Sequence, residues 1–268
     1  MMELNRIYNV DNVIGMKNLP DNFVDLTVTS PPYDNLRTYN GQKQFDFESV
    51  AEQLYRVTKD GGTVVWIVAD AVVNGSETGT SFKQALHFKD IGFKLHDTMI
   101  WTKQGFLHPC PVRYPNTFDY MFVLVKGKIK TVNLIKDREN KYKRTYSGQT
   151  RQRMKNGEME YRKIHKVIGE YGVRTNVWQQ PAGYMSSTPD KIAYNHPAIF
   201  PEKLCKDHII SWSNEGDLVL DPFSGSGTTA VCCRELNRNF IAFELDEKYY
   251  ADSVKRLESR DLNIRLKY

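Results

Sequence analysis

A proline-rich tetrapeptide, Ser30-Pro31-Pro32-Tyr33, directly follows the apolar, β-branched run at residues 24–29. Because proline has a fixed φ and no N–H, Pro31 and Pro32 form a rigid ledge whose carbonyl groups are free to accept hydrogen bonds. An exocyclic base amine has two N–H bonds to donate. The Ser30 hydroxyl and the Pro31 carbonyl could each accept one, with Tyr33 stacked on the base. The tetrapeptide predicts an amine-binding site, with a purely structural turn as the alternative.

Such a ledge would activate the amine for attack on a methyl donor. The lone pair of an exocyclic amine is delocalised into the ring. Hydrogen bonds to both amine protons favour a pyramidal nitrogen with a localised lone pair. The rate would then come largely from positioning and electrostatics, with no covalent intermediate and no cysteine nucleophile. An amine inside a duplex reaches such a site only when its base is flipped out of the stack.

A second segment, Asp221-Pro-Phe-Ser-Gly-Ser-Gly-Thr-Thr229, places two glycines between an apolar run and a predicted helix. Glycine lets the backbone turn sharply and approach a ligand closely. A phosphate-binding P-loop would need Lys after Gly227, and a dinucleotide fingerprint has Ala230 at its third glycine position, a tolerated variant. An S-adenosylmethionine site fits better, with Asp221 facing the ammonium group and Glu244 accepting from the ribose hydroxyls. An ordinary tight turn is the alternative.

Alternating apolar runs and helical periodicities indicate an α/β domain with a mostly parallel, doubly wound sheet. In such sheets ligands bind beyond the carboxyl ends of the strands, which is where both special segments lie. The first predicted helix spans 47–57, and Gly61-Gly62 is expected to end it. Pro201 suits the first turn of another helix. The predicted strands are 24–29, 63–69, 96–101, 118–125, 218–220 and 240–244, and two further helices follow at 228–236 and 249–257.

The chain has 268 residues, enough for one large α/β domain with an inserted lobe. No apolar stretch approaches the roughly 20 residues of a membrane span, and the N-terminus does not resemble a signal peptide. The four cysteines show no CxxC spacing, which favours a reducing cytoplasm. His196, Cys205 and His208 are too loosely spaced to predict a metal site.

Charge is distributed unevenly along the chain. Residues 126–166 hold nine Lys, five Arg and four acids, a net charge of +10, so the rest of the chain carries −5. This asymmetry favours a polyanionic partner bound through one segment, although a solvated basic loop is equally compatible with it. Tyr142, Tyr146 and Tyr161 lie among the basic residues and suit contact with DNA. Residues 126–190 show little periodicity, so an irregular inserted lobe is expected there.

The two motifs, in this order, resemble the S-adenosylmethionine-dependent DNA methyltransferases that modify exocyclic amines. Thr29–Tyr33 (TSPPY) corresponds to the catalytic motif and Asp221–Thr229 to the cofactor motif, with a variable basic stretch between them, as in the family's β group. The resemblance implies a Rossmann-like class I methyltransferase fold with a mostly parallel seven-stranded sheet. It also implies a catalytic half at 1–125, a target-recognition region at 126–192 and a cofactor-binding half at 193–268.

The resemblance extends to residues outside these motifs. Asn195-His196-Pro197-Ala198 with Phe200-Pro201 resembles the segment around the methionine end of the cofactor, Asp11 the acid near its adenine, and Glu244 the ribose-binding acid. The expected catalytic residues are Ser30, Pro31, Pro32 and Tyr33. The expected cofactor-binding residues are Asp11, His196, Pro197, Phe200, Asp221, Phe223, Ser224, Gly225, Ser226, Gly227, Thr228, Thr229 and Glu244. The expected DNA contacts are Arg37, Tyr39, Lys141, Lys143, Arg144, Arg151 and Arg153, with Arg37 pairing with Asp34 or Glu48 as the alternative.

The family also informs the target. Members with Ser before Pro-Pro-Tyr mostly resemble cytosine-N4 enzymes, and members with Asp there mostly resemble adenine-N6 enzymes, so Ser30 favours cytosine. An RNA or protein-amide methyltransferase and a non-catalytic DNA-binding relative are the alternatives. The expected partners are double-stranded DNA and a cognate restriction endonuclease acting at the same site. Both a monomer and a dimer are compatible with the sequence.

Overall fold

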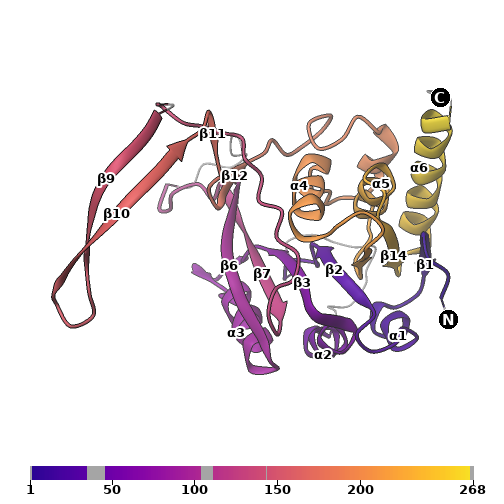
Figure 1. Cartoon of the computed structure of the whole chain (residues 1–268). Helices are drawn as coiled ribbons and strands as arrows, with labels where there is room; N and C mark the ends of the chain where they lie inside the picture. The colour runs from indigo at the N-terminus through magenta and orange to yellow at the C-terminus, as the bar shows by residue number, and fades with distance from the viewer. Residues whose placement is uncertain (1, 35–45, 104–110, 143, 266–268) are drawn as a thin grey trace. The chain divides into compact units, whose positions relative to one another are not determined.

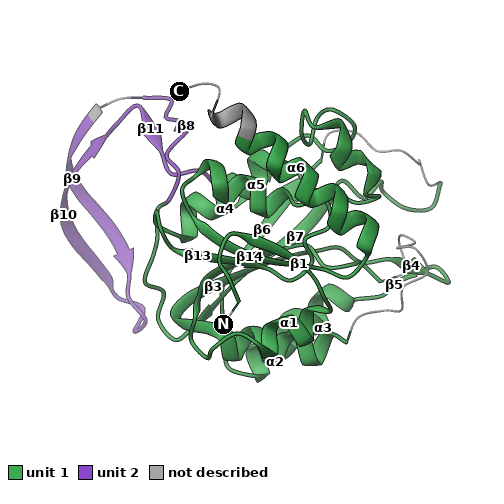
Figure 2. Cartoon of the chain, turned by 90° about the vertical axis from the view of Figure 1, so that its right-hand side faces the viewer, with its two compact units in different colours: residues 1–133, 176–268 green, residues 134–175 purple. Residues whose placement is uncertain are grey.

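The computed structural model describes residues 2–34, 46–103, 111–142 and 144–265. It divides the chain into two compact units: residues 1–133 with 176–268 form unit 1, and residues 134–175 form unit 2 (Figure 2). Unit 2 lies inside the stretch 126–192, whose role in target recognition stays a prediction. No helix of the described residues is long and apolar enough to cross a membrane.

The centre of unit 1 is a sheet that has eight strands in its described part, in the order β1-β14-β13-β2-β3-β7-β6-β12 (Figure 1). Every neighbouring pair is parallel except β3–β7 and β7–β6, so β7 is the antiparallel strand of this sheet. The strands are β1 (Arg6–Asn9), β2 (Val24–Thr29), β3 (Thr58–Val68), β6 (Phe93–Thr102), β7 (Phe118–Lys126), β12 (Val177–Gln179), β13 (Leu218–Asp221) and β14 (Asn239–Glu244).

Helices cover both faces of this sheet, α1, α2 and α3 on one side and α4, α5 and α6 on the other (Figure 1). They span Asn12–Lys17 (α1), Phe47–Val57 (α2), Thr80–Asp90 (α3), Glu202–Trp212 (α4), Thr228–Glu235 (α5) and Glu247–Arg265 (α6). Unit 1 also contains the short hairpin β4 (Val72–Val73) and β5 (Ser76–Glu77), and a 3-10 helix at Lys191–Asn195.

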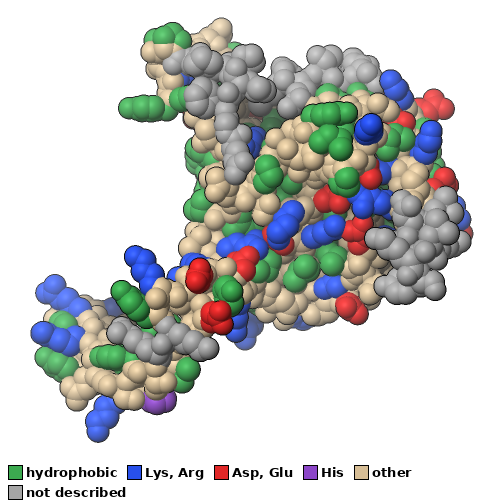
Figure 3. Space-filling view, turned by 90° about the horizontal axis from the view of Figure 1, so that it is seen from above, with side chains coloured by type: hydrophobic (Ala, Val, Ile, Leu, Met, Phe, Trp, Pro, Cys, Tyr) green, Lys and Arg blue, Asp and Glu red, His purple; other side chains and the backbone are tan. Residues whose placement is uncertain are grey.

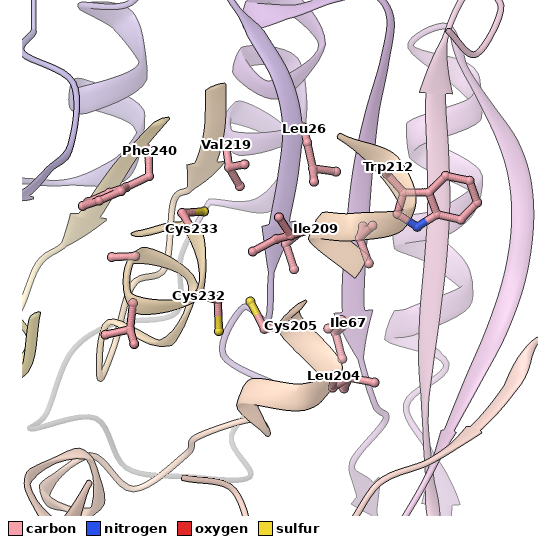
Figure 4. Close-up of a cluster of buried hydrophobic side chains, with 14 of the residues drawn as sticks. Leu26, Ile67, Leu204, Cys205, Ile209, Trp212, Val219, Cys232, Cys233 and Phe240 are labelled. Atoms are coloured by element: carbon pink, nitrogen blue, oxygen red, sulfur yellow. The ribbon is translucent and has the colours of Figure 1, made fainter. Parts of the chain in front are cut away.

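Alternate residues of β3 supply the two hydrophobic cores between the sheet and its helices. Val65 and Ile67 pack on the α4–α6 side, whereas Val64, Trp66 and Val68 pack on the α1–α3 side, as the two-residue period of a strand dictates. Both groups are at most 1 % exposed. Figure 4 shows the first core, where side chains of α4 and α5 meet those of the central strands. Burial on both faces explains why these strands read as continuous apolar runs.

The predicted fold class is confirmed, and β2 and α2 have the bounds expected from the sequence. The prediction that Gly61-Gly62 ends α2 is wrong, because α2 ends at Val57 and both glycines lie within β3. They accommodate a shift in the β2–β3 register between Thr58 and Thr63. Gly61 has φ +82°, a value that L side chains rarely adopt.

The sheet has one strand more than the seven expected. β12 lies at residues 177–179 and pairs in parallel with β6, so the expectation that 126–190 does not continue the sheet is wrong at this point. Trp178 in β12 is 5 % exposed and joins the core of unit 1. The short elements β1 and α1, and the helix α3, were also not expected.

Unit 2 is built from β structure rather than irregular loops. β9 (Arg144–Arg153) and β10 (Met159–Ile168) form an antiparallel hairpin of ten residue pairs, and β8 (Arg138–Glu139) pairs with β11 (Tyr171–Gly172). Arg174 forms an ion pair with Asp137 beside the second pair of strands. The expectation of an irregular lobe is therefore wrong for this part of the chain.

A substitution at Gly62 tests the irregular part of β3, where its register with β2 shifts. An added Cβ would lie 2.9 Å from the carbonyl oxygens of Asp25 and Lys59, which are backbone atoms that cannot rotate away. We expect Gly62→Ala to lower the free energy of unfolding by roughly 1–3 kcal/mol, the usual cost of overpacking. Urea unfolding measures it. Gly169→Ala is the control, since its nearest neighbour would be 3.9 Å away; an equal loss in both variants would contradict the explanation.

Candidate active site

Four neighbouring parallel strands, β1, β14, β13 and β2, end at the same edge of the sheet, and each is followed by a predicted site segment. Asp11 follows β1, Glu244 ends β14, the glycine loop follows β13, and the Ser30–Tyr33 ledge follows β2. The carboxyl-end edge of a parallel sheet is where ligands bind in this architecture. The topology thus gathers segments that are up to about 230 residues apart in the chain.

A buried hydrogen bond joins the ledge to the glycine loop. The Thr29 hydroxyl donates to Asp221 Oδ1 at 2.7 Å, and the Phe223 N–H donates to the same oxygen at 3.0 Å. Thr29 is 0 % and Asp221 1 % exposed. Burial raises the pKa of the Asp221 carboxyl, while the hydrogen bonds oppose that rise. In this structure Asp221 links the two loops, and its predicted contact with the cofactor ammonium group stays a prediction.

The ledge itself is held from two sides. The Ser30 hydroxyl donates to Tyr33 Oη at 2.9 Å, so the first and last side chains of the Ser30–Tyr33 ledge are hydrogen-bonded to each other. Pro31 is buried, and Pro32 and Tyr33 are half-buried. Asp34 Oδ2 accepts from the Ala71 N–H and from the Thr78 hydroxyl, which ties the end of the ledge to the segment after β3. Asp34 therefore acts as a loop cap.

The glycine loop turns tightly around the end of β14. Gly225 and Gly227 have φ values of +50° and +77°, which favour glycine. Glu244 Oε2 accepts from the Gly225 N–H at 2.7 Å, and Glu244 Oε1 accepts from the Asp246 N–H at 2.9 Å. Burial raises the pKa of the Glu244 carboxyl, while these hydrogen bonds oppose the rise. The predicted ribose acid thus lies against the predicted cofactor loop.

His196 approaches the same loop from the segment before α4. A Cβ added to Gly225 would lie 3.0 Å from His196 Cε1, a tight contact that favours glycine at this position. His196 Nδ1 lies 2.6 Å from the Ala198 carbonyl oxygen, and the ring packs edge-on against Tyr249. A small hollow lies beside His196. It is lined by Ile192, Ala193, His196, Gly225, Ser226, Tyr249 and Asp252.

These residues fit S-adenosylmethionine, which would place its polar groups against the loop. Gly225 and Gly227 let the loop pack closely against His196 and Ser253, and Ser224 Oγ is buried without a hydrogen-bond partner among the described residues. Asp11 caps α1 by accepting from the Ile14 N–H, and remains half-buried at the same edge. The remaining predicted cofactor residues lie within this segment or before α4. Phe223 is half-buried and Ser226, Thr228 and Thr229 are buried, whereas Pro197 and Phe200 are half-buried before α4.

The predicted DNA contacts are only partly described. Arg37, Tyr39 and Lys143 lie outside the described residues, as does the alternative pairing of Arg37. Lys141 is exposed, Arg144 is the first residue of β9, and Arg151 and Arg153 are exposed on β9. Their contact with DNA stays a prediction.

A buried arginine of α6, which sequence reasoning missed, also shapes the site. Arg256 is 1 % exposed and donates from Nη1 to the Ser226 carbonyl oxygen at 2.9 Å and to Thr228 Oγ1 at 3.1 Å. Its other nitrogens pair with Asp190 and Glu202 at 2.8 Å. Arg256 thus connects the glycine loop to the segment that carries His196. The neighbouring residues in sequence include Lys255 and Glu258 and do not indicate that Arg256 is buried, because charged residues on a helix normally face solvent.

Comparison with known proteins agrees with the geometry. A family model described as a DNA methylase, covering N6 and N4 methyltransferases, matches residues 24–255. The orphan methyltransferase M.BamHII of Bacillus amyloliquefaciens is 52 % identical over 247 residues, which cover 91 % of this chain and 92 % of that protein. The DNA adenine methyltransferase YhdJ of Escherichia coli K12 is 25 % identical over 276 residues, covering 96 % and 83 %.

Solved structures share the fold. The cytosine-N4-specific PvuII DNA methyltransferase superposes with a TM-score of 0.69 at 19 % identity, over 96 % of this chain and 87 % of that one. The complex of M1.HpyAVI with S-adenosylmethionine superposes with a TM-score of 0.61 at 23 % identity, over 94 % and 99 %. This chain belongs to the S-adenosylmethionine-dependent amino DNA methyltransferases.

Two threonines of β2 test the bond between the loops. We expect Thr29→Val to lower the free energy of unfolding by about 1–3 kcal/mol and to weaken S-adenosylmethionine binding, because Asp221 loses a buried donor. Thr27→Val is the matched control: Thr27 is also 0 % exposed, but its hydroxyl has no partner among the described residues, so the change should be neutral or stabilising. Urea unfolding and calorimetry measure both; equal effects would refute the role of Thr29.

Asp190 gives a pH-dependent prediction. Burial pushes its pKa upward, but the guanidinium groups of Arg256 and Arg260 outweigh burial and hold the pKa below its ordinary value. The stabilisation is therefore present above the unfolded pKa near 4 and lost as pH falls through the lower folded pKa. We expect Asp190→Asn to cost roughly 1–3 kcal/mol at pH 7 and progressively less below about pH 4.

Unfolding followed from pH 7 to pH 3 tests this dependence. The exposed Asp90 on α3 supplies the control, and Asp90→Asn should change stability by less than about 0.5 kcal/mol at every pH. A deficit for Asp190→Asn that stays constant down to pH 3 would contradict the charge interaction.

Proposed function

We propose that this protein is a site-specific DNA methyltransferase that methylates the exocyclic N4 amine of a flipped cytosine. The observation that carries the proposal is the meeting of the Ser30–Tyr33 ledge with the glycine loop, through the hydrogen bond between Thr29 and Asp221. The serine at position 30, where a carboxylate would favour adenine, supports cytosine. Methylation of adenine N6 is the second candidate, favoured by the similarity to the DNA adenine methyltransferase YhdJ.

The ledge would act on the amine through its acceptors. Because the Ser30 hydroxyl donates its proton to Tyr33 Oη, its lone pairs remain available to accept from one amine N–H. The Pro31 carbonyl accepts from the other. These two bonds localise the nitrogen lone pair, and the Tyr33 ring stacks on the flipped base. S-adenosylmethionine, when bound, supplies the electrophilic methyl group.

The neighbouring strand ends would hold the cofactor in line with that nitrogen. The glycine loop would bring its backbone close to the ligand, and Glu244 would exchange its bond with Gly225 for bonds to the ribose hydroxyls. His196, beside Gly225, and Asp11, after β1, would complete the cofactor site. A ligand fixed in this way reacts through proximity and orientation, which contribute several kcal/mol in such reactions.

The biological setting is proposed from the relatives. M.BglII of Bacillus subtilis, 28 % identical over 263 residues, is named a type II methyltransferase, and M.BamHII an orphan methyltransferase. We propose a restriction–modification type of activity, with a cognate endonuclease for the same site as a candidate partner. Cys205, Cys232 and Cys233 are free and buried, which suits the reducing cytoplasm where such DNA is found.

The product identifies the target base. Unmethylated bacterial DNA incubated with the protein and S-adenosylmethionine, then digested to nucleosides, should yield N4-methylcytosine by mass spectrometry. N6-methyladenine instead would replace the first candidate by the second. Parallel reactions with RNA and with a glutamine-containing peptide should give no product; methylation of either one in preference to DNA would overturn the proposal.

Substitutions in the ledge test the mechanism. We expect Ser30→Ala to lower kcat by roughly 10- to 100-fold while the dissociation constant for S-adenosylmethionine changes less than about twofold, because the lost acceptor acts on the amine. Tyr33→Phe keeps the ring but frees the serine proton, so it should cost less. Ser259→Ala, on the exposed face of α6, is the control. An unchanged kcat in Ser30→Ala would exclude this role.

A further inference from the structure

The two faces of the β9–β10 hairpin differ in charge. Cross-strand partners share a face, and Arg151↔Tyr161, Arg153↔Met159 and Gln149↔Lys163 all fall on one face because their positions differ by two. We call this side, which also carries Ser147↔His165 and Thr145↔Val167, the basic face. Its three basic side chains are exposed and make no ion pair within the described residues.

The opposite face carries a smaller net charge. It carries Arg162, Lys166 and Glu160, and Arg162 forms an ion pair with Glu160 at 2.8 Å. Tyr146 lies along this face over Gly148, where an added Cβ would approach the tyrosine Oη to 2.6 Å. Arg144 is the register partner of Ile168 on this same face, so the sequence gives the basic face a net charge of +3 and the opposite face +2.

The described side chains of both faces are exposed or half-buried. No residue at 145–153 or 159–168 is buried, and Tyr161 and Val167 are 58 % and 69 % exposed. An isolated two-stranded hairpin is marginally stable in water, so a ribbon of ten pairs with two bare faces is suited to a partner that covers one of them. Figure 3 shows Lys and Arg side chains standing out from unit 2.

The length of the β9–β10 hairpin and the side chains on its basic face favour duplex DNA as the partner. Ten residues of strand extend over about 33 Å, and a two-stranded ribbon of this kind fits the major groove of B-form DNA, which is about 12 Å wide. Arginine binds the guanine O6 and N7 atoms in a bidentate manner and glutamine the adenine N6 and N7 atoms. Arg151 also lies over the Tyr161 ring, with 5.5 Å between its Cζ and the ring centroid, which restricts the guanidinium.

We infer that the β9–β10 ribbon enters the DNA major groove with its basic face toward the bases, and that Gln149, Arg151, Arg153 and Lys163 read the recognition sequence. The inference rests on the proposed function, since it assigns the sequence reader of the same reaction. The opposite face, with Arg162 and Lys166, faces away from the bases and contributes through charge alone.

A pair of matched double variants tests the assignment. Arg151→Gln with Arg153→Gln removes two positive charges from the basic face, and Arg162→Gln with Lys166→Gln removes two from the opposite face of the same hairpin. The recognition sequence is first obtained by mapping methylated positions in genomic DNA treated with the unsubstituted protein. Then kcat/KM is measured on a duplex that contains this site, and S-adenosylmethionine binding by calorimetry confirms that both variants retain the fold.

We expect the basic-face variant to lose roughly 10- to 100-fold or more in kcat/KM and to methylate altered sequences, because each bidentate base contact discriminates by about 5- to 150-fold. The opposite-face variant removes the same two positive charges and also leaves Glu160 without its ion-pair partner, yet it should lose less than about fivefold and keep the same sequence. Equal losses in the two variants, or altered sequences in both, would overturn the assignment.

Modified duplexes test the groove itself. Replacing single purines in the site by their 7-deaza analogues removes the N7 acceptor of the major groove and leaves base pairing intact. At one or more positions this should lower kcat/KM of the unsubstituted protein by at least about fivefold, with little further effect on the basic-face variant. Full activity on every deaza duplex would exclude major-groove reading. A protein that methylates no DNA at all would instead refute the proposed function.

Discussion

The parallel pairing of β2 with β13 is the constraint on which the site depends. Leu26 and Thr27 pair with Val219 and Leu220, so the two strands end together and their loops start side by side. Insertion of one strand between them would add about 4.8 Å to the separation of the loops, more than a hydrogen bond can span. The buried bond from Thr29 to Asp221 then fixes the ledge against the glycine loop.

The buried guanidinium of Arg256 extends this constraint beyond the sheet. A charge that is 1 % exposed needs acceptors on every side, and Arg256 obtains them from the glycine loop, from α4 and from the segment at 188–190. Removing one acceptor would leave a buried charge partly unpaired, which is costly. The position of the loop, of α6 and of the chain leading to His196 is therefore determined jointly, and the hollow beside Gly225 follows from all three.

The sequence predicted the parts of this arrangement that depend on local patterns. β2 was predicted with its observed bounds because burial on both faces of a central strand produces a continuous apolar run, and both site loops were found because proline and glycine mark special backbone. Gly61 and Gly62 led to the wrong prediction of a helix end, because glycine is favoured both at helix ends and at irregularities in a strand. β12 has three residues, too few for any period, and its pairing with β6 is a tertiary contact. Arg256 could not be found because its burial results from the packing of α6.

The β9–β10 hairpin illustrates a further limit of predictions from local sequence. Composition revealed an excess of basic residues, but the sorting of those residues onto two faces depends on the register of β9 with β10. The turn sets this register: the Met154 N–H donates to the Glu158 carbonyl oxygen at 2.8 Å, and Gly157 adopts φ +87°. A slip of one residue in either strand would turn its side chains to the other face and would separate Arg151 from Tyr161. The side chains offered to a DNA groove are thus decided by a five-residue turn that carries none of the proposed reading residues, and a count of charges alone does not reveal them.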